Sequence, residues 1–120
     1  VFIAGQIPFW NGDVLHIGKV GVELTVEDAT KSAKVCGLNI IAQLKAACDG
    51  NLDRVRRCVK IGVFVNCIDG FTQQPQIANG VSDLMVEVFG EAGRHARFAI
   101  GTNALPRNCA TEADAVFELS

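Results

Sequence analysis

Arg97 and Glu112 offer the clearest combination of chemistries among the 120 residues of this sequence. A guanidinium group is a planar fork of N–H donors, so it can bind a carboxylate through two parallel hydrogen bonds. A glutamate carboxylate beside a cleft can accept a proton and orient a water molecule. From the sequence pattern alone, an ordinary ion pair is the better interpretation of Arg97. For Glu112, the alternative to a catalytic role is a strand residue that faces solvent.

The two histidines are weaker candidates for catalysis. His95 lies two positions before Arg97, and residues two apart in a strand share a face, so both could reach one cleft. A packed or solvent-facing imidazole is nevertheless the favoured interpretation of His95. His16 is assigned a structural role, and Trp10, beside a turn, is interpreted as a packing anchor.

The cysteines are odd in number and no two have CxxC spacing, so neither a disulfide framework nor a zinc site is indicated. They are Cys36, Cys48, Cys58, Cys67 and Cys109. We expect reduced thiols in a cytosolic protein, most of them filling the core as small hydrophobic side chains. Cys109 stands apart because its closeness to Glu112 makes it a candidate for the cleft. We expect no metal.

Composition excludes some classes of protein. A net charge of −2 and a pI near 5.6 argue against a nucleic-acid-binding domain, which usually carries a basic excess or stripe. No apolar run reaches the length of a membrane span. The hydrophobic content of 49% is high for a small monomer, so we expect part of the apolar surface to lie in a subunit interface.

The length fits one domain spanning residues 1–120. The chain opens at Val1, inside a strand-like run. We therefore expect natural N-terminal residues upstream, and any targeting segment would lie there.

Two helices are predicted from apolar residues spaced three and four apart. The first runs from Val26 to Asp49, with Thr25 as N-cap and Gly50 as the stop. Its stripe consists of Ala29, Ala33, Cys36, Ile40, Leu44 and Ala47. The second runs from Gln76 to Phe89, with Ile77, Val81, Leu84 and Val88 on one side.

Five strands are predicted from alternation and turn signals. They are Val1–Ala4, Val14–Ile17, Val59–Val65, Arg97–Ile100 and Ala110–Leu119, with Asn11-Gly12 as a hairpin turn between the first two. The order is β-β-α-β-α-β-β. We expect an α+β fold in which two helices pack on one face of a mixed sheet.

Several stretches together resemble the RidA/YjgF family, also called reactive intermediate deaminases or endoribonuclease L-PSP. They are Ala4-Gly5-Gln6-Ile7-Pro8, Val63-Phe64-Val65, Phe89-Gly90-Glu91, and the C-terminal series Ala96-Arg97, Leu105-Pro106 and Glu112. The C-terminal series is the most specific, because three separated elements keep both residue type and spacing. The resemblance covers nearly the whole chain.

The resemblance implies a chorismate-mutase-like homotrimer, with the sheets packed into a barrel-like core and clefts between neighbouring subunits. It also implies hydrolysis of reactive enamines and imines, such as 2-aminoacrylate and 2-iminobutanoate, to 2-oxo acids and ammonia. No metal or organic cofactor is expected.

The resemblance also implies roles for individual residues. Arg97 matches the arginine that binds the substrate carboxylate, and Glu112 matches the glutamate that holds or activates water. Groups at Gly5 and Cys109 are expected to help bind the substrate. Ser82 falls near a position where the deaminase branch often carries Asn, and Ala4 replaces a common serine. These two departures suggest a divergent branch.

Three alternatives remain at the level of sequence. A non-catalytic trimer would bind a small carboxylate at the same Arg97. An endoribonuclease or translation inhibitor is disfavoured by the acidic balance and by the lack of a histidine pair or basic groove. A chorismate mutase is suggested by the fold resemblance alone, and fold does not fix function.

Overall fold

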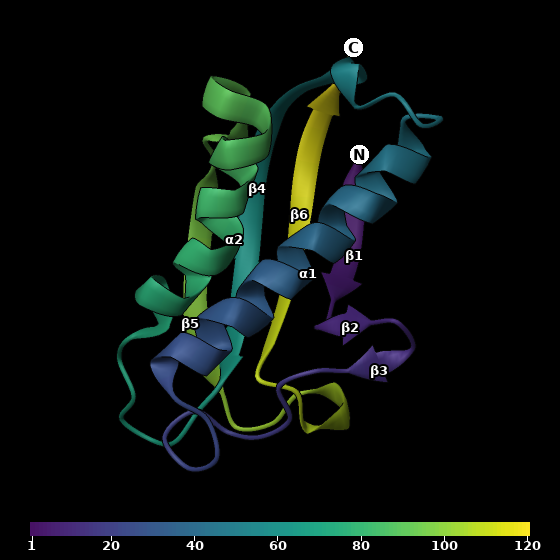
Figure 1. Ribbon diagram of the computed structural model, residues 1–120. Coiled ribbons are helices and arrows are strands. Elements are labelled where there is room, and N and C mark those ends of the chain that lie inside the picture. Colours follow the sequence, from purple (N-terminus) through teal and green to yellow (C-terminus); the bar gives the residue numbers. More distant parts are fainter.

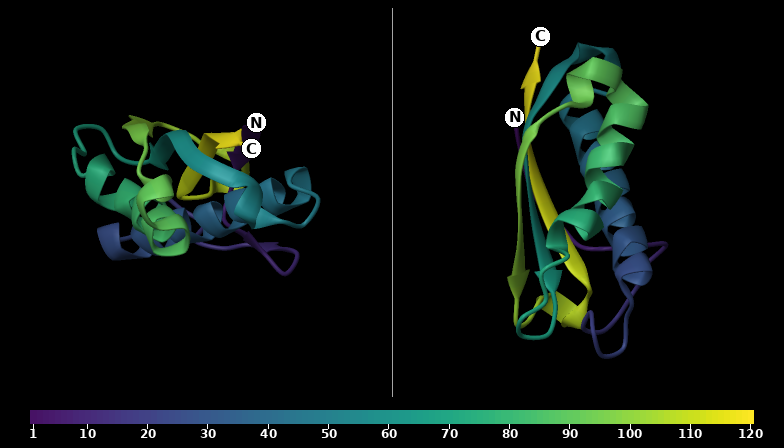
Figure 2. Two further views of the ribbon diagram at one scale, coloured as in Figure 1. Left: turned by 90° about the horizontal axis from the view of Figure 1, so that it is seen from above. Right: turned by 90° about the vertical axis from the view of Figure 1, so that its left-hand side faces the viewer.

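Four strands form a mixed sheet in the order β1-β6-β4-β5, and two helices cover one of its faces (Figure 1). The computed structural model describes residues 1–120. The strands are β1 (Phe2–Gln6), β4 (Val55–Asn66), β5 (Ala96–Thr102) and β6 (Thr111–Leu119), and the helices are α1 (Val26–Ala47) and α2 (Gln74–Phe89). β4 and β5 are parallel, whereas β6 is antiparallel to β1 and β4. The predicted α+β class is confirmed (Figure 2).

The second predicted strand is wrong in position. Asn11-Gly12 does form a turn, but it joins the short strands β2 (Phe9–Trp10) and β3 (Asp13–Val14), which make a separate two-stranded hairpin. The expected Val14–Ile17 strand fails because His16 adopts φ +56°, which extended backbone does not allow. Trp10 lies in this hairpin with 48% of its surface exposed, so it is not the predicted packing anchor.

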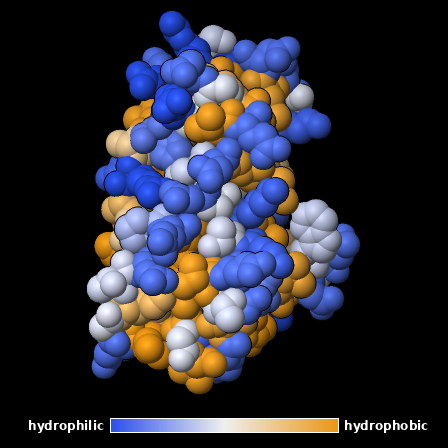
Figure 3. All heavy atoms as spheres, turned by 60° about the vertical axis from the view of Figure 1, so that its left-hand side comes forward, coloured by the Kyte–Doolittle hydropathy of each residue, from blue (hydrophilic) through white to orange (hydrophobic).

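α2 begins two residues earlier than predicted, because Pro75 fits the first helical turn, where its missing N–H costs no hydrogen bond. Ile77, Val81 and Leu84 are buried against the core as predicted. Val88 was expected on the same side but is exposed, and Met85 is buried instead. The outer surface of α2 and β5 carries many hydrophilic side chains (Figure 3). Neither helix combines the length and apolar character that a membrane span requires.

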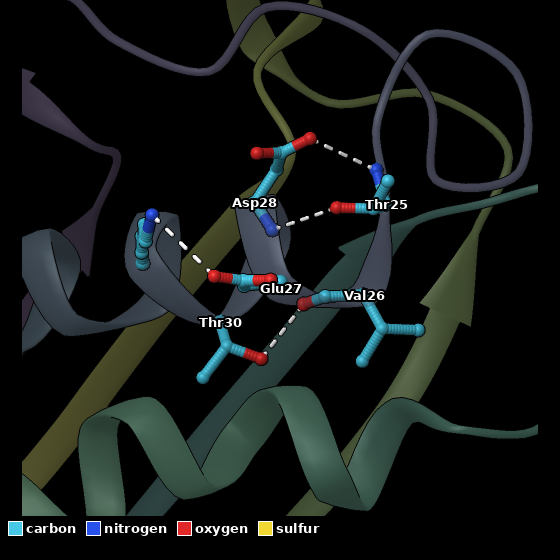
Figure 4. A network of polar contacts seen from close by, with 6 residues as sticks. Thr25, Val26, Glu27, Asp28 and Thr30 are labelled. Carbon is cyan, nitrogen blue, oxygen red and sulfur yellow. Dashed lines mark hydrogen bonds and ion pairs between the residues drawn. The ribbon is translucent and has the colours of Figure 1, made fainter.

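The N-terminus of α1 is fixed by a reciprocal pair of hydrogen bonds (Figure 4). The Asp28 backbone N–H donates to Thr25 Oγ1, and the Thr25 backbone N–H donates to the Asp28 carboxylate, each at 3.1 Å. The bond from the Thr25 backbone is the main reason why the pKa of Asp28 is lowered. The predicted N-cap at Thr25 is confirmed, and the two residues form a capping box with Asp in the place of the usual Glu or Gln.

The predicted stripe of α1 is buried from Ala29 to Leu44, but Ala47 is exposed. The helix ends at Ala47, two residues before the predicted end. Asp49 and Gly50 follow with φ of +54° and +87°, a left-handed backbone that Gly adopts readily and that ends the helix.

β4 is the central strand and is longer than predicted, since it begins at Val55 and ends at Asn66. Ile61, Val63 and Val65 are fully buried beneath the helices, as their alternation predicted. Val59 was expected on the same face, yet it is 43% exposed. The register of β4 against β6 shifts between Cys58 and Lys60, and such a bulge turns the extra residue out of the alternation.

The alternation predicted for the last strand is confirmed. Ala113, Ala115 and Phe117 of β6 are buried on the helix side, while Glu112 and Asp114 point to the other side. β1 continues to Gln6 and therefore passes the break predicted after Ala4. The side of the sheet away from the helices, here called the open face, carries Phe2, Phe64, Phe98, Ile100 and Val116.

All five cysteines are buried and none forms a disulfide. Burial raises the pKa of Cys36 and of Cys58 to about 12, and that of Cys109 to about 11. These thiols are therefore both shielded from reagents and poor in the reactive thiolate form.

Replacement of Thr25 by Ala should lower the free energy of unfolding by about 1 kcal/mol, because the Asp28 N–H loses its acceptor at the helix end. Urea unfolding followed by circular dichroism measures this change. Thr72→Ala is the control, since Thr72 is exposed and lies outside any helix or strand. Equal stability of the Thr25 variant and the unmodified protein would contradict the capping role.

At pH 8, a disulfide reagent such as dithiobis(nitrobenzoate) should label the native protein far more slowly than the unfolded protein, which should yield five equivalents of thiol. Absorbance of the released thiolate gives both rate and count. Rapid labelling of a folded sample, with unchanged circular dichroism, would show that the cysteines are accessible.

Candidate functional site

Arg97 lies in β5, the outer strand of the sheet, and its side chain reaches toward α2. It pairs with Ile61 of β4, whose side chain is on the helix-covered side. Arg97 Nη1 donates to Asn79 Oδ1 at 2.8 Å and to Ser82 Oγ at 3.0 Å, and Nη2 donates to the Pro75 carbonyl at 3.2 Å. The first turns of α2 therefore hold the guanidinium group in one orientation.

The guanidinium group of Arg97 keeps donors for a ligand. It has five N–H bonds, of which three are used within the chain, so the Nε–H and one Nη2–H remain. Nε and Nη2 form one side of the guanidinium fork, and such a side binds a carboxylate through two parallel bonds. Arg97 is exposed, so a ligand in solution can reach these donors.

Ser82 and His95 belong to the same cluster. Ser82 Oγ lies 2.8 Å from His95 Nε2, and His95 Nδ1 lies 2.6 Å from the Gly93 carbonyl oxygen. A shallow hollow of about 250 Å³ opens beside them, and it is lined by Ser82, Asp83, Val86, Arg94, His95 and Arg97. The structure thus joins the predicted residues Arg97 and Ser82.

Glu112 lies on the open face, because it pairs with Phe64 of β4 and alternates with the buried residues of β6. Gly5 of β1 lies directly beside it, and a Cβ atom added to Gly5 would collide with the Glu112 carboxylate. Glycine at this position therefore leaves room for the carboxylate. The Glu112 carboxylate makes no hydrogen bond within the chain and the residue is only half-buried, so the carboxylate can bind a water molecule or a ligand.

Cys109 belongs to neither group. It is fully buried, its Sγ donates to the Thr111 carbonyl at 3.4 Å, and its backbone N–H donates to the Pro106 carbonyl at 3.2 Å. The thiol therefore has no access to a ligand within this chain. A part for Cys109 in substrate binding stays a prediction.

The predicted site residues thus fall into two groups on opposite faces of the sheet. Arg97 and Ser82 lie at the β5 edge on the helix side, whereas Gly5 and Glu112 lie together on the open face. Arg97 pairs with Ile61 and Glu112 pairs with Phe64, three residues further along β4. Since the sheet separates the two groups, no small ligand touches both within one chain.

Asn79 is a site residue that the sequence analysis missed. It holds Arg97 together with Ser82, and the three-residue spacing of the two on α2 puts them on one helix face. That spacing was the available signal. His95 was interpreted as packed or exposed, but it is half-buried and bonded to Ser82. His95 lies just before β5 and contacts Ser82 Oγ, as Arg97 does; a common cleft for the two was the less favoured alternative from the sequence.

Comparison with known proteins places these residues in a family. The family model described as "YjgF/chorismate_mutase-like, putative endoribonuclease" matches residues 1–117. Protein TCP17 of Trypanosoma cruzi is 45% identical over 119 residues, which are 98% of this chain and 74% of that protein. The crystal structure of the protein Atu1372, of unknown function, from Agrobacterium tumefaciens is 40% identical, with a TM-score of 0.98 over 99% of this chain and 76% of its own.

A more distant structure shares the fold. Escherichia coli TdcF with bound serine is 20% identical, with a TM-score of 0.66 over 99% of this chain and 80% of its own. The resemblance stated from the residues is thereby confirmed. The chain belongs to the YjgF/chorismate mutase-like family.

Proposed function

We propose that this protein hydrolyses small 2-imino acids and their enamine tautomers to 2-oxo acids and ammonia, at sites formed between copies of the chain. The observation that carries the proposal is the state of Arg97, which is fixed by α2 and still has two N–H donors for a carboxylate. A hydrogen bond to a charged group contributes about 1.5–3 kcal/mol, enough to hold a small acid in one orientation.

Little further machinery is needed, because an imine adds water readily once it is protonated. Glu112 supports the reaction as the group that accepts a proton from the attacking water, since its carboxylate makes no hydrogen bond within the chain. The opposite placement of Arg97 and Glu112 explains why the proposed site requires two copies, with Arg97 from one and Glu112 from its neighbour.

The open face supports association of copies. Phe2 is 84% exposed and Ile100 is 47% exposed, and Phe64, Phe98 and Val116 lie between them with partial exposure. Exposed apolar side chains gathered on one face of a sheet commonly mark a protein interface. The arrangement we propose is the homotrimer that the family resemblance implies, with the open faces turned inward.

A second candidate is a protein that binds small carboxylates without turnover. It is favoured by the separation of Glu112 from Arg97, because the Arg97 group alone is complete enough to hold an acid. The two candidates differ in what Glu112 does, since simple binding of a carboxylate does not require it.

Arg97→Ala should lower kcat/KM for 2-iminobutanoate by about 10- to 100-fold, the equivalent of losing about 1.5–3 kcal/mol of charged hydrogen bonding. Glu112→Gln should lower kcat and leave the affinity for 2-oxobutanoate unchanged. Ammonia release is measured while a threonine dehydratase generates the imine, and calorimetry gives the affinity.

Arg56→Ala and Glu118→Gln are matched controls, because both side chains are exposed on strands of the same sheet and belong to neither group. Ligand binding without any acceleration of hydrolysis by the unmodified protein would favour the second candidate. Unchanged turnover in Arg97→Ala would overturn the proposed function, and RNA cleavage that survives this substitution would point to a different activity.

Association should be lost when a charge is placed on the open face. Sedimentation velocity is expected to give three times the 12.8 kDa of one chain for the unmodified protein and a single chain for Ile100→Asp. Val88→Asp is the control, because Val88 is equally exposed, at 46%, but lies on α2. A monomeric unmodified protein, or a trimeric Ile100→Asp variant, would contradict the arrangement.

A further inference from the structure

Every group that orients Arg97 within the chain is electrically neutral. The guanidinium group donates to the backbone carbonyl of Pro75 at 3.2 Å, to the amide oxygen of Asn79 at 2.8 Å and to the hydroxyl of Ser82 at 3.0 Å. The ion pairs within the chain join other residues, namely Lys31 to Glu27, Arg54 to Asp49 and Arg94 to Glu91. Arg97 is therefore held in one orientation while its positive charge stays unpaired.

Other charged side chains lie near Arg97 without pairing with it. Asp83 and Arg94 line the hollow beside Ser82, which is bonded to Nη1 of the guanidinium group. Arg94 pairs with Glu91 at 3.1 Å, and Asp83 forms no ion pair. The free edge of Arg97 is formed by Nε and Nη2, on the other side of the group from Nη1. A carboxylate ligand at that edge therefore meets a cation to which no carboxylate of the chain is bonded.

Asn79 is the position at which the chain could pair this cation but does not. Its Oδ1 accepts from Arg97 Nη1, and its Nδ2 donates to no group in the chain. An aspartate there would keep the acceptor oxygen and exchange the amide nitrogen for a second oxygen, which adds a full negative charge. Asn79 is exposed on α2, so its side chain does not fill the core. The amide thus orients Arg97 without neutralising it.

We propose that Asn79 determines how strongly the site binds carboxylates, because its neutral amide positions Arg97 and leaves the charge of the guanidinium group for the ligand. The inference rests on the proposed function in taking Arg97 as the group that binds the substrate carboxylate. Asn79 is a positioning residue that acts through Arg97 and does not touch the reacting atoms. The ligand class that this arrangement favours is a small acid with one negative charge, because one unpaired cation matches one anionic group.

A carboxylate at position 79 would weaken the binding of such a ligand in two ways. It would form a charge-assisted hydrogen bond with Nη1 and so offset the charge of the guanidinium group. It would also repel a carboxylate bound at the opposite edge of the same group. At a solvent-exposed site, the Coulomb interaction of two unit charges separated by one guanidinium group changes the affinity by about 10-fold.

The test compares Asn79→Asp with Asn79→Ala. Calorimetry should show that Asn79→Asp raises the Kd for 2-oxobutanoate by about 10-fold. Asn79→Ala should raise it less, because this change removes one orienting hydrogen bond and adds no charge. Asn11→Asp is the matched control and should leave the Kd unchanged. It makes the same replacement at an exposed residue of the β2–β3 hairpin, where the turn accepts Asn-Gly and Asp-Gly alike.

Two further readouts separate an effect of charge from a merely structural role. The affinity of the unmodified protein for 2-oxobutanoate should fall as sodium chloride is added, because salt screens an exposed cation, and this fall should be less steep in Asn79→Asp. The uncharged 2-oxobutanamide should bind both proteins equally. In the turnover of 2-iminobutanoate, Asn79→Asp should raise KM and retain kcat at saturation.

The outcomes distinguish this inference from the function on which it rests. If Asn79 only oriented Arg97, aspartate would serve as well as asparagine, since it keeps the acceptor oxygen. Equal affinity of Asn79→Asp and the unmodified protein, or a larger loss in Asn79→Ala, would therefore overturn the inference while binding through Arg97 stands. Failure of the unmodified protein to bind 2-oxobutanoate, or equal binding by Arg97→Ala, would remove the proposed function and the inference with it.

Discussion

The pairing of β4 with β5 along one edge and with β6 along the other determines where each candidate residue lies. Strand side chains alternate between faces, and register-paired residues share a face. Arg97 is paired with the buried Ile61, so it turns toward α2, and Glu112 is paired with Phe64, so it turns away. A slip of one residue between β4 and β5 would turn Arg97 away from Ser82, and a slip of one residue between β4 and β6 would turn Glu112 to the helix side. The chemistry therefore depends on backbone register before it depends on any side chain.

The second constraint is the position of α2 along this sheet. Arg97 binds the carbonyl of Pro75 in the first turn and Ser82 two turns later, so one side chain of an edge strand is bonded to two levels of the helix. Those contacts orient the guanidinium group and leave its Nε–H without a partner in the chain. An edge strand presents unpaired backbone, and this edge strand also presents a positioned cation.

Sequence patterns predicted most of the elements because their signals are local. In α1 from Ala29 to Leu44, and in β6, the spacing of the apolar residues along the sequence matches the positions that are buried. Val59 could not be assigned correctly, since the shift of β4 against β6 depends on a partner strand more than fifty residues away. The strand predicted over Val14–Ile17 was also wrong, because the left-handed backbone of His16 has no signal in the residue type.

The sequence predicted which residues belong to the candidate site better than it predicted where they lie relative to one another. Arg97 and Glu112 follow from the family spacing, but nothing in that spacing indicates that the sheet lies between them. The contact of Ser82 with His95 joins a helix to the residue before a strand, thirteen positions later, and requires the packing of α2 on β5. Long-range packing of this kind has no signature in a single sequence.

The placement of Arg97 and Glu112 on opposite faces has a consequence for how the amount of protein relates to its activity. If the site forms between copies as proposed, a lone chain carries both halves and can use neither. Activity per chain would then fall on dilution below the dissociation constant of the assembly, while every chain remained folded. Activity would then require a minimum concentration of the protein. A copy that lacks Arg97 and a copy that lacks Glu112 could also form one intact site together.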